Sequence, residues 1–330
     1  MPWIVAGNMI RNNMNVGNGV KGKVLLASPR GFCAGVVRAI DIVNLALDAY
    51  GLPLYVRREI VHNKYVVNEL RQKGTIFVDD LEEVPPGNRV IFSAHGVAPE
   101  VRTAAIERHL QVIDATCPLV TKVHMEAIKY ARAGYTIIMI GHQDHDEVIG
   151  TLGEARESIR VLISTEEVDE LEVPDPGKVA YLTQTTLSLD DTRQIIDRLR
   201  EKFPNIHGPA SEDICYATQN RQAVVLELAK RAEIILVVGS GNSSNSRRLV
   251  EVAQGQGISA YLIDDICDIR KEWLDQIRIV GLTAGASAPE GLVERVLDYL
   301  KGVGYPEVEI VGSIREDVEF ALPAGLHPAR

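Results

Sequence analysis

Residues 233–253 read EIILVVGSGNSSNSRRLVEVA: an apolar run, a polar loop and an amphipathic segment. This order is typical of a buried strand, a loop at its carboxyl end and a helix that returns along the sheet. The same order recurs along the chain after other runs that we expect to be strands, namely KVLLASP, PLYVRREIV, RVIFSAHG, QVIDATCP, YTIIMIGH, VAYLTQT, SAYLIDD and RIVGLTAG. Strands that alternate with helices predict an α/β protein with mostly parallel sheets and helices on both faces.

The loops after these strands recur in groups of three. Loops at strand carboxyl ends are where α/β proteins bind ligands. The most chemically capable residues of these loops form three triplets, each opened by a cysteine just before a helix: Cys33, His62, His95; Cys117, His145, Thr185; Cys215, Ser244, Ser287. Successive cysteines are 84 and 98 residues apart, which indicates a threefold repeat of roughly 90-residue units with loops aimed at one centre. The alternative is that three cysteines fall near helix starts by chance.

The composition excludes several classes of function. The 330 residues carry 35 Lys and Arg against 45 Asp and Glu, a net charge of −10, whereas proteins that bind nucleic-acid backbones carry basic stripes. No run approaches the roughly 18 consecutive apolar residues of a membrane span. Residues 1–22 lack the basic and apolar regions of a secretory signal, so we expect a flexible leader and a cytoplasmic protein with no nucleic-acid or membrane partner.

The cysteines are therefore expected to be thiols or metal ligands rather than disulfides. A helix N-terminus stabilises a thiolate, which favours nucleophilic chemistry or metal ligation. Three such cysteines at one centre would form a tripod of soft ligands, suited to zinc with one open position or to an iron–sulfur cluster with one iron left free. We expect Cys267 to be an ordinary thiol.

Two other sets of residues suggest a ligand. His62, His95 and His145 come from different strand ends and indicate a ligand-facing ring rather than a second metal set. Residues 239–246, GSGNSSNS, and 284–289, AGASAP, place hydroxyl, amide and backbone N–H groups at helix N-termini, which is typical of anion sites. Neither loop is a P-loop or a GxGxxG turn. The alternative is that these Ser and Asn residues only cap helices.

A carboxylate lies in the same loop as His145. Glu147 is two residues further on, and the TQTTLS segment at 183–188 supplies hydroxyl groups from the next strand end. A carboxylate near hydroxyl groups in a dry pocket can carry protons to a substrate. The alternative is a solvated loop, since Asp144 and Asp146 are also close.

Nine segments, spread in order from about residue 23 to 313, resemble the 4-hydroxy-3-methylbut-2-enyl diphosphate reductase family: PRGFCAGVVRAI, EIVHNKYVV, FSAHGV, DATCPLV, GHQDHDEVIGT, YLTQTTLS, DICYATQNRQ, GSGNSSNSRRL and TAGASAP. The resemblance implies three α/β domains in a cloverleaf around one [4Fe-4S] cluster per chain. It implies that Cys33, Cys117 and Cys215 hold the cluster and leave one iron free. Asp146 stands where some members have proline, which concerns only local loop geometry.

The resemblance also implies roles for the polar residues. Glu147 would donate protons and Thr185 would position the reacting hydroxyl, while a set of histidines, serines and an asparagine would hold the diphosphate: His62, His95, His145, Ser243, Ser244, Asn245 and Ser287. The implied reaction is the last step of the non-mevalonate route, reductive dehydroxylation of an allylic diphosphate to isopentenyl and dimethylallyl diphosphate. A ferredoxin or flavodoxin type protein would donate the electrons.

The expected domain boundaries follow the cysteines. They are a leader at 1–22, a strand at 23–33 that belongs to the third domain, three α/β domains at 34–117, 118–214 and 215–313, and a tail at 314–330. Two alternatives use the same cysteines. One is a redox-neutral dehydratase resembling quinolinate synthase, which would need carboxylate-binding loops and no electron donor. The other is a cluster-bearing redox sensor, which gives no reason for the histidines or the GNSSNS loop.

Overall fold

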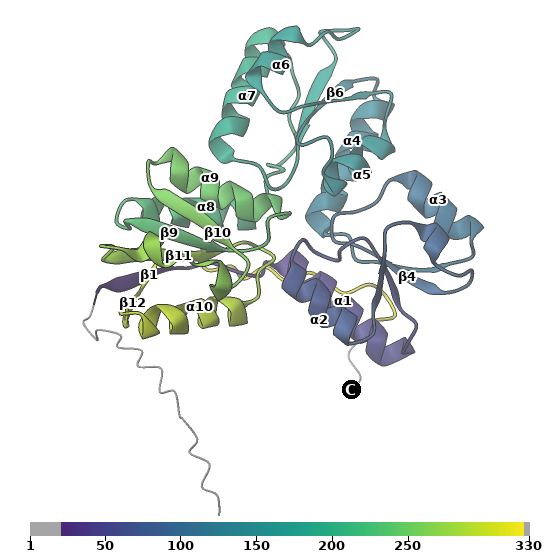
Figure 1. Ribbon diagram of the computed structural model, residues 1–330. Coiled ribbons are helices and arrows are strands. Elements are labelled where there is room, and N and C mark those ends of the chain that lie inside the picture. The colour runs from purple at the N-terminus through teal and green to yellow at the C-terminus, as the bar shows by residue number, and fades with distance from the viewer. Residues whose placement is uncertain (1–20, 327–330) are drawn as a thin grey trace, which may run out of the picture.

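The computed structural model describes residues 21–326, which form three parallel sheets arranged around a common centre (Figure 1). The sheets have five, four and three strands. Within each of the three sheets, every pair of neighbouring strands is parallel, which confirms the predicted α/β class. Most of the expected leader and the last four residues of the expected tail lie outside the described residues.

Each sheet contains the same three-stranded unit. Its first strand is central, its second lies on one side and its third on the other, in the orders β3-β2-β4, β7-β6-β8 and β10-β9-β11. The strands are β2 (Tyr55–Arg57), β3 (Ile76–Val78) and β4 (Arg89–Phe92), then β6 (Thr136–Ile140), β7 (Ile159–Leu162) and β8 (Val179–Thr183), then β9 (Ile234–Val238), β10 (Ser259–Ile263) and β11 (Ile279–Ala284). The repeat predicted from the cysteine spacing is thus visible in the strand order.

Three further strands extend two of the units. β5 (Gln111–Asp114) pairs with β4, while β1 (Lys23–Ala27) pairs with β11 on one side and β12 (Glu307–Val311) on the other. The first strand of the described chain therefore lies in the sheet formed by its last third. The expected strands omitted β3, β7 and β12, because β3 has only three residues and charged residues interrupt the apolar runs of β7 and β12.

The helices repeat as well. A helix opens each unit: α1 (Ala34–Tyr50), α4 (Pro118–Arg132) and α8 (Tyr216–Ala229). A second follows each first strand: α2 (Lys64–Gln72), α5 (Asp146–Glu154) and α9 (Ser244–Gly255). A third follows each third strand: α3 (Pro99–Glu107), α7 (Leu189–Lys202) and α10 (Glu290–Gly302). Between the second and third strands lie α6 (Thr165–Glu170) or short 3-10 turns.

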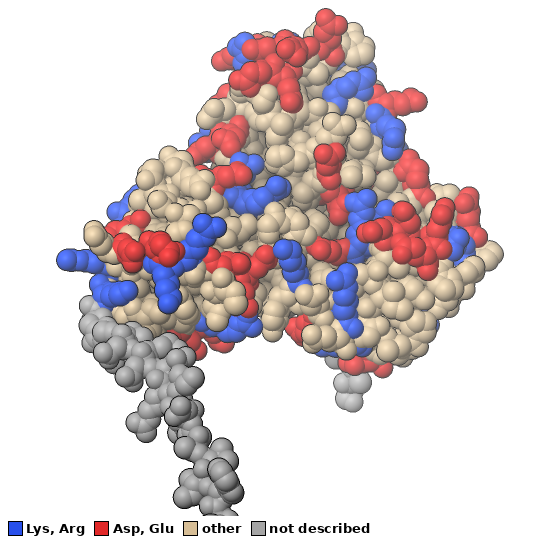
Figure 2. Space-filling view, viewed as in Figure 1, with Lys and Arg blue, Asp and Glu red and all other residues tan. Residues whose placement is uncertain are grey.

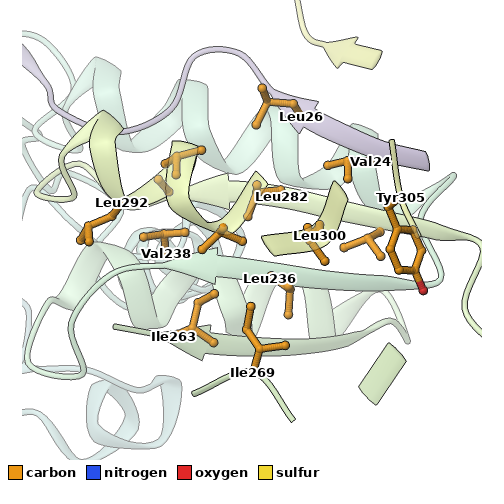
Figure 3. Packing of buried hydrophobic residues seen from close by; sticks show 14 of the residues in the cluster. Val24, Leu26, Leu236, Val238, Ile263, Ile269, Leu282, Leu292, Leu300 and Tyr305 are labelled. Atoms are coloured by element: carbon orange, nitrogen blue, oxygen red, sulfur yellow. The ribbon is translucent and has the colours of Figure 1, made fainter. Parts of the chain in front are cut away.

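The five-stranded sheet shows why its strands are apolar throughout. Leu236 and Val238 pack in the cluster that includes Leu292 and Leu300 of α10, which Figure 3 shows. The intervening Ile235 and Val237 pack in a second cluster, with residues of α8 and α9. A strand covered on both faces needs apolar side chains at every position, so it reads as a continuous run rather than an alternating one.

The surface carries many charged side chains (Figure 2). Figure 2 shows acidic and basic side chains interspersed on the face in view. Among residues 21–326 no helix is long and apolar enough to cross a membrane.

The strand order determines where a ligand can bind. Because the second and third strands lie on opposite sides of the first, the connections leave a crevice at the carboxyl ends of the first and third strands. The loops after β2 and β4, β6 and β8, and β9 and β11 carry His62, His95, His145, Thr185, Ser244 and Ser287. The three crevices face the centre of the molecule.

Candidate functional site

One central cavity is lined by all twelve residues singled out from the sequence: Cys33, Cys117, Cys215, His62, His95, His145, Glu147, Thr185, Ser243, Ser244, Asn245 and Ser287. They come from all three units, and the cysteines are separated by up to 182 residues in the chain. The fold therefore brings the predicted set together at one place.

The three cysteines occupy equivalent positions. Cys33, Cys117 and Cys215 are the N-cap residues of α1, α4 and α8, each with extended backbone and none with its side chain capping the helix. Their sulfurs are therefore available to a ligand. Burial raises the pKa of Cys117 to about 12 and that of Cys215 to about 11. In the free protein these groups are neutral thiols, so a bound metal must displace their protons.

The space between the sulfurs is kept open by a glycine. A Cβ atom on Gly35 would lie 2.8 Å from Cys117 Sγ and 3.9 Å from Cys33 Sγ. Cys33, Cys117 and Cys215 all line this cavity, so the three sulfurs lie around one volume. Three soft sulfur donors in a mostly apolar cradle fit an iron–sulfur cluster with one free iron, and they would also fit zinc with one open position. Cys267 is exposed and does not line the cavity.

The three histidines form one cluster. The rings of His62 and His95 stack with their centroids 3.9 Å apart, and the ring of His145 meets them edge-on at 5.5 and 6.0 Å. Burial lowers the pKa of His145 to about 3 and that of His95 well below its usual range, with repulsion from neighbouring histidines adding to the shift. Both rings are therefore neutral in the free site. An anion bound here would offset these costs and favour the protonated rings.

Hydrogen bonds orient two of these rings. Nδ1 of His145 accepts the backbone N–H of Glu147 at 3.2 Å, so its Nε2 carries the proton in the neutral ring. Nδ1 of His62 lies 3.4 Å from a carboxylate oxygen of Glu59, which also accepts from Asn242 at 2.6 Å. The hydrogen bond to His62 contributes most to the lowered pKa of Glu59.

Asp146 connects two units beside this cluster. It forms an ion pair with Arg58, which follows β2 in the first unit. Ligand atoms of His62, His95 and Asp146 also lie within 4.8 Å of one another. The sequence predicted only a local effect of aspartate at this position, and the contact with another unit was missed because it depends on the assembled fold.

Glu147 and Thr185 form a pair in the dry part of the cavity. One carboxylate oxygen of Glu147 accepts the backbone N–H of Thr185 at 2.8 Å, and the other accepts its hydroxyl at 2.9 Å. The Glu147 side chain is 2% exposed, which argues against the solvated-loop alternative. Burial raises its pKa to about 7, against the lowering effect of the two hydrogen bonds from Thr185. A carboxyl group with this pKa is present in both protonation states near neutral pH.

The serine and asparagine loops do more than cap helices. Ser243 does cap α9, since its hydroxyl accepts the N–H of Ser246 at 3.3 Å. Ser287 donates to the carbonyl of His62 at 2.9 Å, which links the third unit to the first. Asn245 accepts the N–H of Ala286 at 2.9 Å, and the loops after β9 and β11 are thereby joined. All of these side chains are buried at the cavity wall, as ligand groups must be and simple caps need not be.

The cavity lining also includes residues that were not predicted from the sequence, among them Thr218 and Phe320. The Thr218 hydroxyl accepts from the Asn245 amide at 3.3 Å and lies 3.2 Å from Cys215 Sγ, so it connects the anion loops with a cysteine. The sequence could have indicated Thr218, because it lies one helical turn after Cys215. Phe320 reaches the cavity from the C-terminal segment, whose role was unassigned. This segment crosses from the third unit to α1 (Figure 1), a path that no local pattern indicates.

Comparisons with known proteins bear on the whole chain. The family described as LytB protein matches residues 24–301. A 4-hydroxy-3-methylbut-2-enyl diphosphate reductase of Leifsonia xyli subsp. xyli is 54% identical over 92% of this chain and 90% of its own. The solved E-1-hydroxy-2-methyl-but-2-enyl-4-diphosphate reductase of Plasmodium falciparum is 38% identical, with a TM-score of 0.90 over 92% of this chain and 96% of its own.

A second solved structure is similar at lower overlap. It is described as (E)-4-hydroxy-3-methyl-but-2-enyl diphosphate reductase, the terminal enzyme of the non-mevalonate pathway. It is 31% identical, with a TM-score of 0.61 over 85% of this chain and 99% of its own.

Proposed function

The chain belongs to the LytB family of 4-hydroxy-3-methylbut-2-enyl diphosphate reductases, and from this premise we propose how its central cavity carries out the reaction. The enzyme is an oxidoreductase and the terminal enzyme of the non-mevalonate pathway. Membership of this family leaves the redox-neutral dehydratase and the redox sensor without support. The observation that carries the site proposal is the convergence of three cysteines and nine polar residues on one cavity.

Cys33, Cys117 and Cys215 hold one [4Fe-4S] cluster per chain. Their equivalent N-cap positions present three sulfurs to one volume, and Gly35 leaves room between them. Family membership favours the cluster over zinc, because a reductase needs a redox-active group. When bound, the cluster supplies the electrons and one iron with an open position for the allylic hydroxyl.

The diphosphate of the substrate binds at the other end of the cavity. His95 and His145 gain protons as the anion enters, since their costs of burial and repulsion are then offset, and His62 lies beside them. Further donors are arranged around them: Ser243, Ser244, Asn245 and Ser287. The overall charge of −10 disfavours an anion, so affinity rests on these local donors.

Glu147 and Thr185 act at the reacting end of the substrate. Reductive removal of the hydroxyl consumes two electrons and two protons, one proton leaving with the oxygen as water and one ending on the allyl carbon. Glu147, with its pKa of about 7, is the group able to deliver protons inside the dry cavity. Thr185, held on both carboxylate oxygens, positions the hydroxyl beside it. The products are isopentenyl and dimethylallyl diphosphate.

Electrons come from a ferredoxin or flavodoxin type donor.

The chain divides into three α/β domains at 34–117, 118–214 and 215–313, with the strand at 23–33 in the third and a tail from residue 314. This division is supported by the repeated strand order and by β1 in the five-stranded sheet.

The proposal is tested by purification without oxygen, followed by Mössbauer spectroscopy and an assay on (E)-4-hydroxy-3-methylbut-2-enyl diphosphate. We expect four irons per chain and turnover only with a reduced one-electron donor. Turnover without a donor, or full activity of an iron-free zinc form, would reject the proposed mechanism.

A further inference from the structure

Each of the three helices that open a unit carries a cation soon after its cysteine. Arg38 of α1 and Lys122 of α4 lie five residues after theirs, and Arg221 of α8 lies six residues after its own. Each side chain donates hydrogen bonds to the segment just before the cysteine that opens the next unit, the first unit following the third. We refer to Arg38, Lys122 and Arg221 as the brace residues.

Arg38 connects the opening helix of the first unit with the segment after β5 that leads into Cys117. Its Nη1 donates to the carbonyls of Ala115 at 3.2 Å and Thr116 at 3.1 Å. These two residues come directly before Cys117.

Lys122 connects the opening helix of the second unit with the segment that leads into Cys215. Its Nζ donates to the carbonyl of Ser211 at 2.5 Å and to the carboxylate of Asp213 at 2.8 Å. The other oxygen of that carboxylate accepts the N–H of Thr183 at 3.0 Å, at the end of β8. The segment held in this way ends two residues before Cys215.

Arg221 connects the opening helix of the third unit with the segment after β1 that leads into Cys33. Its Nη2 donates to the carbonyl of Gly31 at 2.7 Å and its Nε to the same oxygen at 3.2 Å. Gly31 lies two residues before Cys33. The three contacts therefore run from the helix of each cysteine to the segment before the next, and they close into a ring.

We propose that the brace residues position the cysteines for the cluster, each one holding the cysteine of the following unit. The inference rests on the proposed function, in which these cysteines are the cluster ligands. A cysteine at an N-cap is placed by the chain just before it, because the helix begins only at the next residue. Hydrogen bonds from a cation to those preceding carbonyls are among the stronger ones in proteins. The ring thus specifies all three sulfur positions at once.

Burial supports a positioning role for Arg221 in particular. Its side chain is fully buried, and its remaining donors go to the Ala217 carbonyl at 2.8 Å and to the Glu316 carboxylate at 3.0 Å. A buried guanidinium is costly unless all its donors are used, and here they bind main chain and one carboxylate. All three brace residues donate to backbone carbonyl oxygens of these segments. Loss of a brace residue is therefore expected to change the position of the backbone before the cysteine.

The C-terminal segment attaches to two of the three braces. Besides the Glu316 contact with Arg221, the carbonyl of Ala321 accepts from Arg38 Nε at 2.7 Å. Phe320, between these two attachments, lines the cavity. The segment that closes this side of the cavity is therefore held by the same residues that hold the cysteine segments.

The test follows each cysteine as the cluster is withdrawn from the holoenzyme. An iron chelator and iodoacetamide are added without oxygen, and alkylation of the three cysteines is followed by mass spectrometry. The variants are Arg38→Met, Lys122→Met and Arg221→Lys, the last of which keeps the charge beside Glu316 so that the chain still folds. Arg38→Lys tests rescue by a retained cation. Lys129→Met, at an exposed position of α4, is the matched control.

We expect cluster loss about tenfold faster or more in each methionine variant, the change that corresponds to one charge-assisted hydrogen bond. The cysteine that reacts first should be Cys117 for Arg38→Met, Cys215 for Lys122→Met and Cys33 for Arg221→Lys. General destabilisation would accelerate all three sites alike, and that result would overturn the inference. Wild-type rates in all brace variants would overturn it too.

The failure of the inference can be told apart from failure of the proposed function. If Cys33→Ser, Cys117→Ser and Cys215→Ser lose the cluster while the brace variants behave as wild type, only the ring is wrong. If the serine variants keep the cluster, the cysteine assignment itself is wrong.

Discussion

The cysteine end and the anion end of the cavity are built from the same three units, yet they preserve the repeat to different degrees. At the cysteine end every unit contributes the same residue at the same place, a helix N-cap. At the anion end the first unit offers two histidines, the second a histidine with Glu147 and Thr185, and the third serines and an asparagine. The proposed cluster can accept three equivalent ligands, whereas the allylic diphosphate proposed for the other end has unlike ends. The proposal thus accounts for a repeat that is kept at the cysteine end and has diverged at the anion end.

The largest effect should come from breaking the symmetric end. Cys33→Ser, Cys117→Ser and Cys215→Ser should each abolish the cluster, because two thiolates cannot replace a three-point attachment. Cys267→Ser should keep it, since that residue is exposed and outside the cavity. Iron and sulfide per chain are the measurement. Equal loss in the Cys267 variant would contradict the assignment.

The second effect concerns the chemistry that only the second unit supplies. Glu147→Gln should keep the cluster and bind substrate, yet lose about 10²–10⁴-fold in turnover, the usual contribution of a positioned proton donor. The amide can keep one of the two hydrogen bonds from Thr185 but cannot deliver a proton. Steady-state rates under excess reductant check this, with the cluster spectrum reporting substrate binding.

Asp144→Asn is the matched control for Glu147→Gln, because Asp144 is an exposed carboxylate in the same loop. It should leave turnover unchanged. Near-normal turnover of the Glu147 variant would remove it from the mechanism.

The third effect concerns the anion end. His62→Ala and Asn245→Ala should each weaken inorganic diphosphate and substrate alike by about 1.5–3 kcal/mol, the range of one charge-assisted hydrogen bond. The iron content should not change, which separates this end from the cysteine end. Binding calorimetry measures both affinities. His142→Ala is the control, since His142 lies in the loop after β6 but does not line the cavity. Unaltered diphosphate affinity in both variants would reject the anion pocket.

Both ends of the cavity could be predicted from the sequence, whereas the contacts that hold them in place could not. The long apolar strands, the cysteines and the polar loops could be predicted, because each is a local pattern of buried runs or of chemistry before a helix. Strand β3 has only three residues and β7 has exposed positions, so both depend on pairing with a distant neighbour. The ring of Arg38, Lys122 and Arg221 and the approach of Phe320 join segments far apart in the chain. Such contacts leave no periodic signal.

A fourth effect is a pH dependence of the reacting end. The pKa of Glu147 is raised to about 7, so the carboxyl is mostly protonated below that pH and mostly ionised above it. A proton donor loses activity as it ionises, so turnover should be level below about pH 7 and fall about tenfold for each unit above it. Glu147→Gln should lack this descending limb. A wild-type profile that stays level to pH 9 would contradict the role.

The smallest effect lies where the two ends meet. The Thr218 hydroxyl accepts from Asn245 at 3.3 Å and is 3.2 Å from Cys215 Sγ, so it is placed to donate to a sulfur of the cysteine end. Hydrogen bonds to sulfur stabilise the reduced, more negative cluster, so Thr218→Val should make the reduction potential roughly 20–60 mV more negative, the equivalent of one neutral hydrogen bond. It should also weaken diphosphate binding slightly, because Asn245 loses a partner.

Thr121→Val is the matched control for this last change. Thr121 lies one turn into α4 and donates to the Cys117 carbonyl at 3.3 Å rather than to a sulfur. Its loss should therefore leave the potential unchanged, although it removes a hydroxyl at nearly the same distance along an equivalent helix. Potentiometric titration followed by electron paramagnetic resonance measures both variants. Equal shifts of the reduction potential in the two variants would mean that Thr218 acts through the helix and not through a hydrogen bond to the sulfur. The anion end would then have no influence on the potential of the cysteine end.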